Sequence, residues 1–235
     1  MSPTAPVATK RWAGAWPDAL AFAGGLAVAW LGGWQTTDLV WSLWLSSLVV
    51  GFAMIVWGIF CPALLRFREG NAAAGIWAAI GAIPLLGFFT MHFGVFHAAH
   101  AGLLHTFFPL GQDGGGSVVA RLGEILWRYG WFLPVAALAE RKGFRWEAMP
   151  PEPPATSVKA ADIAARKARQ AFGTAALFTP YKNVIRMHLL IFFFAFAHFA
   201  KLENFAVYTA VYAGYFFPWR LMLRPAESGN GAQGG

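Results

Sequence analysis

The chain has 235 residues, of which 57% are hydrophobic and 12% are charged, and it contains 22 Phe, 12 Trp and 5 Tyr. An average soluble domain is about 45–50% apolar and about 25% charged. A chain of this size cannot bury such an apolar excess in one soluble core, which excludes an ordinary soluble enzyme, a disordered protein and a nucleic-acid-binding protein. Cys61 is the single cysteine, which excludes a disulfide scaffold. The composition therefore predicts a membrane protein with the lipid bilayer as its partner.

Six hydrophobic runs approach or exceed the length of about 20 residues that a spanning helix needs. They cover residues 19–34, 39–65, 72–104, 118–139, 181–200 and 205–223. We read the first run as an uncleaved helix because no convincing cleavage site follows it. The pattern predicts an all-α, polytopic membrane helix bundle with six transmembrane helices.

The net charge of +7 is distributed unevenly among the loops between these runs. The expected outer segments, 35–38, 105–117 and 201–204, contain one basic residue, Lys201. The basic residues of the expected inner segments are Lys10, Arg11, Arg66, Arg68, Arg141, Lys142, Arg145, Lys159, Arg166, Lys167, Arg169, Lys182, Arg220 and Arg224. Because basic residues collect on the cytoplasmic side, this separation predicts that both termini are cytoplasmic.

The chain divides into two membrane parts and a cytoplasmic linker. The expected parts are 1–139 with transmembrane helices 1–4, 140–179 as the linker, 180–224 with helices 5–6, and 225–235 as a disordered tail. Within the linker, residues 157–172 predict a basic amphipathic helix. Its basic residues are Lys159, Arg166, Lys167 and Arg169. They are candidates for binding the anionic membrane surface, and the equal alternative is a solvated helix between two spans.

Histidines are the first set of polar residues expected inside the bilayer. His92, His97 and His100 lie on the third expected helix, and His188 and His198 lie on the fifth. A rise of about 1.5 Å per residue places His92 and His188 at one depth and His100 and His198 at a shallower one. Imidazole binds Zn, Cu and haem iron, so the pattern predicts a metal or haem site between these helices. The alternative is that each histidine only forms hydrogen bonds across helices.

The second polar set lies on the fourth expected helix, where Arg121, Glu124 and Arg128 share one face. Glu124 and Arg128 have a favourable four-residue spacing, which predicts a buried, internally neutralised ion pair, while Arg121 reaches the outer interface. An anion or proton site is one alternative. Another is that the polar start of this helix lies in the interface, which would make Arg128 shallow.

Two short segments, HFGVFHAAHAGLL and the later PYKNVIRMHLLIFF, resemble a family of bacterial integral membrane proteins named domain of unknown function 6498. The matching positions are His92, Gly94, Phe96, His100, Pro180, Tyr181, Val184 and His188. Asn183 stands where the family is expected to have a basic residue. The resemblance implies a polytopic protein of the bacterial inner membrane, and it implies no activity.

Three functions are compatible with these features, and no catalytic residue can be assigned. The first is a membrane protein that binds haem, Zn or Cu through its histidines and acts in redox chemistry. The second is a non-catalytic accessory or scaffold subunit of a larger membrane complex, with other membrane subunits as partners. The third is a small transporter, which ranks last because Glu124 is the one acid within an expected span and no internal repeat is visible.

Overall fold

The computed structural model describes residues 7–110 and 118–144, together with single residues and short stretches between 161 and 213. These residues contain helices and no strands, which confirms the all-α class. The helices are α1 (Val7–Leu31), α2 (Thr36–Arg68), α3 (Ala72–Phe107), α4 (Val118–Tyr129) and α5 (Leu133–Ala139), with 3₁₀ turns η1 (Gly130–Phe132) and η2 (Arg141–Phe144).

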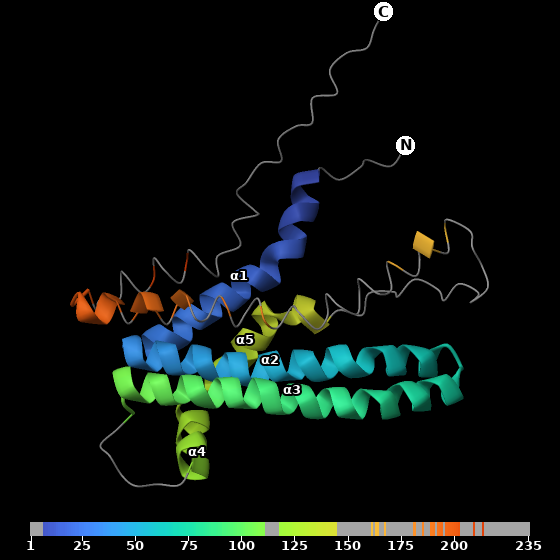
Figure 1. Ribbon diagram of the computed structural model, residues 1–235. Helices are drawn as coiled ribbons and strands as arrows, with labels where there is room; N and C mark the ends of the chain where they lie inside the picture. The colour runs from blue at the N-terminus through green and yellow to red at the C-terminus, as the bar shows by residue number, and fades with distance from the viewer. Residues whose placement is uncertain are drawn as a thin grey trace, which may run out of the picture.

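A long antiparallel hairpin of α2 and α3 dominates the structure (Figure 1). Gly70 takes a left-handed φ of 78° at the turn, and the side chain of Asn71 caps α3 by accepting a hydrogen bond from the Ala74 N–H at 3.1 Å. Among the described residues, α2 and α3 are the two helices that are long and apolar enough to cross a membrane. Their lengths of 33 and 36 residues correspond to about 50 Å or more, which exceeds the roughly 30 Å hydrocarbon layer.

The first turns of α2 form the centre of the molecule. Every residue from Asp38 to Ser46 is buried, which requires neighbours on all sides of the helix. α1, α3, α4 and η1 all supply side chains to the surrounding core. Two tryptophans fasten α2 to the backbone of α3, because the indole N–H of Trp41 donates to the Phe108 carbonyl at 2.8 Å and that of Trp44 donates to the His97 carbonyl at 3.1 Å.

The fourth expected span, residues 118–139, is interrupted, as expected for a helix that contains Pro134. α4 ends at Tyr129, η1 follows, and α5 begins at Leu133. Pro134 explains the break, because it has no N–H to donate to the carbonyl four residues earlier and its ring obstructs a continuous helix there. α4 runs across the hairpin rather than along it (Figure 1), which fits the alternative that its polar residues lie at an interface. α5 then returns along α1 and α2.

Candidate functional site

Asp38 is the buried acid around which three elements meet. Only 11% of its side chain is exposed. Its Oδ1 accepts hydrogen bonds from the Tyr129 hydroxyl at 2.9 Å and from Arg128 Nη2 at 2.8 Å, and its Oδ2 accepts one from the Gln35 backbone N–H at 3.0 Å. A carboxylate removed from water is costly unless it is paired and hydrogen-bonded, and these three donors meet that requirement.

The site residues predicted from the sequence do not include Asp38, Tyr129 or Gln35. A local signal was nevertheless present, because Gln35 and Asp38 have the three-residue spacing of a helix-start box, with side chains reaching each other's backbone. That spacing places Asp38 in the first turn of a helix rather than in a loop. The partnership with Tyr129, 91 residues later, has no such local signal.

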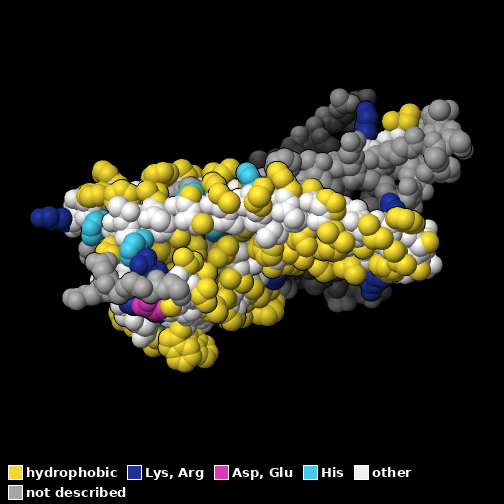
Figure 2. All heavy atoms as spheres, turned by 60° about the horizontal axis from the view of Figure 1, so that its bottom comes forward, with side chains coloured by type: hydrophobic (Ala, Val, Ile, Leu, Met, Phe, Trp, Pro, Cys, Tyr) yellow, Lys and Arg dark blue, Asp and Glu magenta, His cyan; other side chains and the backbone are white. Residues whose placement is uncertain are grey.

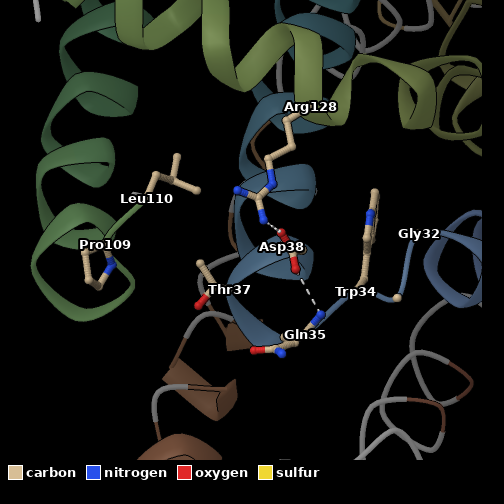
Figure 3. Close-up of a pocket in the computed structure, with 9 residues that line it drawn as sticks. Gly32, Trp34, Gln35, Thr37, Asp38, Pro109, Leu110 and Arg128 are labelled. Carbon is tan, nitrogen blue, oxygen red and sulfur yellow. Dashed lines mark hydrogen bonds and ion pairs between the residues drawn. The ribbon is translucent and has the colours of Figure 1, made fainter. Parts of the chain in front are cut away.

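A pocket of about 550 Å³ lies beside this cluster (Figure 3). The α1–α2 loop, the start of α2, the end of α3 and α4 each contribute to its wall. The lining residues are Gly32, Gly33, Trp34, Gln35, Thr37, Asp38, Pro109, Leu110 and Arg128. Arg128 descends from α4 toward Asp38, with Pro109 and Leu110 on one side and Trp34 on the other (Figure 3).

The predicted buried pair of Glu124 and Arg128 is wrong. Arg128 instead pairs with Asp38, half of its side chain is exposed, and Glu124 and Arg121 are exposed on α4. The physical reason is that Asp38 is far more buried than Glu124, and a charge interaction strengthens as water is removed. A cation within reach of both acids therefore gains more from Asp38.

His97 is the buried histidine of the hairpin, with 1% of its surface exposed. Its Nδ1 lies 3.0 Å from the Phe93 carbonyl, and its Nε2 lies 3.3 Å from the Ser47 hydroxyl. A carbonyl only accepts, so Nδ1–H donates to Phe93, while the Ser47 hydroxyl, which can donate or accept, is the partner of Nε2. Both ring nitrogens are engaged within the hairpin, in agreement with the hydrogen-bonding alternative.

His92 and His100, on the same helix as His97, lie in different surroundings. His92 is exposed and stacks on Phe88 with ring centroids 5.7 Å apart. His100 donates through Nδ1 to the Phe96 carbonyl at 2.8 Å. The described residues contain no group of three or more His, Cys, Asp or Glu that could hold a metal, so His97, His100, His198 and Glu124 are not gathered into a site. His188 lies outside the described residues.

The described part of segment 181–200 packs along α3 in the same direction, as the histidine hypothesis required. Tyr181 lies beside His92 with ring centroids 6.1 Å apart. At the far end, His198 lies 5.7 Å from the Phe108 ring. The predicted depths are therefore wrong: His198 is level with Phe108, about two helical turns beyond His100. The continuation of α3 past Leu104 to Phe107 accounts for about 4.5 Å of this difference. The rest arises because the prediction assumed that both helices end at one level, whereas His198, near the end of its helix, lies beside Phe108.

A second polar contact joins α1 to η2. The Asp18 carboxylate accepts from Arg141 Nη1 and, at 2.7 Å, from Lys142 Nζ. Partial burial alone would raise the pKa of Asp18, which precedes the first expected span, but the hydrogen bonds and charges of Lys142 and Arg141 outweigh burial and lower it. This contact holds η2, which follows α5 directly, against α1.

Of the four candidate membrane-surface residues, Lys167 is described, and it is exposed on a helical backbone. Lys159, Arg166 and Arg169 lie outside the described residues, so the proposed basic face of 157–172 stays a prediction.

One comparison with known proteins gives a result. A family described as Family of unknown function (DUF6498) matches residues 5–148. No match was found among curated proteins or among solved structures. The matched range includes the first histidine motif, from His92 to His100, and ends before the second motif at Pro180. Because the match covers more than half of the sequence and includes α1 to α5, the chain belongs to Family of unknown function (DUF6498).

Proposed function

We propose that this protein is a membrane-embedded accessory or scaffold subunit, which uses the open side of α3 to pack against helices of a larger membrane complex. The surface of α3 supports this proposal. Only 11% of its most apolar 18-residue window is buried, against 44% for α2. Hydrophobic side chains follow the hairpin surface along its length (Figure 2). The exposed large side chains on this helix include Ile76, Trp77, Ile80, Ile83, Phe88, Met91 and Val95.

The single observation that favours a helix partner over lipid alone is a row of small residues on this surface. Gly94, Ala98 and Gly102 are exposed and four residues apart, which places them along one side of α3. Within the described chain, a Cβ added at Gly94 or Gly102 would meet no atom within 4 Å. Lipid chains need only an apolar surface, whereas small residues at this spacing allow another helix backbone to approach closely.

The proposed architecture is six transmembrane helices with both termini cytoplasmic, in a cell inner membrane. The hairpin of α2 and α3 and the charge distribution support it. In a Cys61→Ala background, Thr106→Cys and Glu69→Cys should react with a membrane-impermeant reagent from opposite sides of the membrane. Labelling of both from one side would contradict this topology.

The experiment for the subunit proposal compares glycine variants in native membranes. Gly94→Leu and Gly102→Leu fill the row of small residues. Gly81→Leu is the matched control, because Gly81 is also exposed and open but lies on another side of α3. After extraction in mild detergent, the wild-type chain should migrate in a complex larger than one chain. The first two variants should shift to the solitary chain and the control should not. A solitary wild-type chain, or equal effects of all three variants, would contradict the proposal.

The metal or haem hypothesis is the alternative, and the hydrogen bonds of both His97 nitrogens weigh against it. Optical spectra and elemental analysis of the purified protein test it directly. A Soret band or one equivalent of Zn or Cu would favour it over the subunit proposal. The small transporter stays a further alternative.

A further inference from the structure

We propose that the pocket between the α1–α2 loop, the end of α3 and α4 binds a phosphate group, with Arg128 as its main ligand. This inference is independent of the subunit proposal. The volume of about 550 Å³ lies within the usual range of small-ligand pockets, about 300–1,000 Å³. The charged side chains of its described wall are Asp38 and Arg128.

Asp38 does not offer its charge to a ligand. Its two oxygens already accept from Tyr129, Arg128 and the Gln35 backbone, and its side chain is 11% exposed. A cationic ligand would therefore have to displace donors that stabilise a buried carboxylate, which is costly. The charge in the pocket wall that a ligand can reach is therefore the positive charge of Arg128.

Arg128 is held in place by Asp38, and part of its side chain is still exposed. Its Nη2 faces Asp38, while half of the side chain is exposed. The guanidinium also lies 5.6 Å from the centroid of the Tyr129 ring, which restricts its position further. A guanidinium has five N–H donors in a planar fork that matches the oxygens of a phosphate. An arginine positioned by a buried carboxylate presents the rest of this fork without a loss of side-chain freedom on binding.

The remaining walls suit a phosphate whose substituent is apolar. The amide of Gln35 and the hydroxyl of Thr37 add polar groups, and Trp34, Pro109 and Leu110 add apolar ones. Trp30 and Leu31, which directly precede the lining residue Gly32, are 68% and 84% exposed. Two sources present this chemistry here: the phosphate of a phospholipid headgroup, with its chains over Trp30 and Leu31, and a soluble phosphate.

The test uses the full chain in detergent and three probes: inorganic phosphate, a short-chain phosphatidic acid, and the diacylglycerol with the same chains. Gln35→Glu puts a negative charge in the pocket and leaves the Asp38–Arg128 contact intact. Gly123→Glu is the matched control, because it adds the same charge to α4 at an open position outside the pocket wall. Arg128→Lys keeps the positive charge but removes the planar fork, and it decides the question if Gln35→Glu fails to fold.

We expect phosphatidic acid to bind and the diacylglycerol not to bind, with affinity about tenfold or more weaker in Gln35→Glu and in Arg128→Lys. The Gly123→Glu variant should bind like the wild type. Competition by inorganic phosphate would identify a soluble phosphate as a sufficient ligand, and binding of the lipid alone would identify the headgroup. Equal binding of phosphatidic acid and diacylglycerol, binding of neither lipid nor phosphate, or equal weakening by Gly123→Glu would overturn the proposal.

Discussion

The two halves of the α2–α3 hairpin are packed differently. In the half that contains Trp44 and His97, α2 is buried on every side, and side chains of α2 form hydrogen bonds to α3. In the half next to the turn, the described contacts include a small cluster around Ile55 and Ile59, and Trp77 on α3 is 73% exposed.

This difference shows how a pair of helices that are apolar enough to cross a membrane can combine a fixed geometry at one end with an exposed apolar surface at the other. Apolar side chains alone do not favour one neighbour over lipid, because lipid tails are as apolar as leucine. Indole N–H groups, hydroxyls and a buried imidazole do distinguish between neighbours, because they need specific partners. These polar groups lie in the half where α1, α4 and η1 also converge. Under the proposed function, the half next to the turn is available for lipid or another subunit.

The largest expected effect is at Asp38, the buried acid in the half of the hairpin that contains Trp44 and His97, here called the packed half. Asp38→Ala removes the acceptor of three donors and leaves the Tyr129 hydroxyl buried without it, so the free energy of unfolding should fall by about 3 kcal/mol or more. Unfolding in mixed micelles measures this loss. A matched Glu124→Ala variant, at an exposed acid on α4, should lose about 0.5 kcal/mol or less. Equal losses would show that Asp38 is not an anchor of the packed half.

A pair of tryptophan substitutions compares the two halves directly. Trp44→Phe removes the hydrogen bond to the His97 carbonyl and leaves a void in a fully buried position, so we expect a loss of about 2 kcal/mol. Trp77→Phe, in the half next to the turn, should cost about 0.5 kcal/mol or less in detergent. A larger loss of stability in Trp77→Phe than in Trp44→Phe would contradict the difference in packing between the two halves.

His97→Ala separates hydrogen bonding from metal binding in the packed half. The variant loses the contacts to Ser47 and Phe93, so stability should fall by about 0.6–2 kcal/mol per lost interhelical bond, with the metal content unchanged. His92→Ala, at an exposed position, should change neither quantity. Loss of one metal equivalent from the His97 variant would restore the metal hypothesis.

The smallest expected effect is at the contact between α1 and η2. The pKa of Asp18 is lowered in the folded state, so its stabilising contribution is present above the unfolded pKa and lost as pH falls below about 4. Asp18→Asn should therefore cost about 1 kcal/mol at neutral pH and remove this part of the acid dependence. Unfolding midpoints at pH 7 and at pH 3 test both statements, and an unchanged acid dependence in the variant would disprove the assignment.

The local pattern of apolar residues was sufficient to predict the two long helices, α2 and α3. The runs expected at 39–65 and 72–104 correspond to α2 and α3, because uninterrupted apolar sequence specifies a membrane helix wherever it occurs in the chain. The caps at Gln35 and Asn71 also depend on neighbours a few residues away. By contrast, residues 118–139, which were expected to form one span, divide at Gly130 and Pro134 into elements of different direction.

The sequence by itself determined the all-α class, the apolar hairpin and the residues available for polar contacts. The tertiary structure decided which of those contacts form: Arg128 pairs with Asp38 rather than Glu124, and His97 forms a hydrogen bond with Ser47. The physical reason is that helix formation depends on neighbours within a few residues, whereas the strength of an ion pair or a buried hydrogen bond depends on how far distant elements exclude water from it. That exclusion exists only after α1, α3 and α4 have packed around the start of α2.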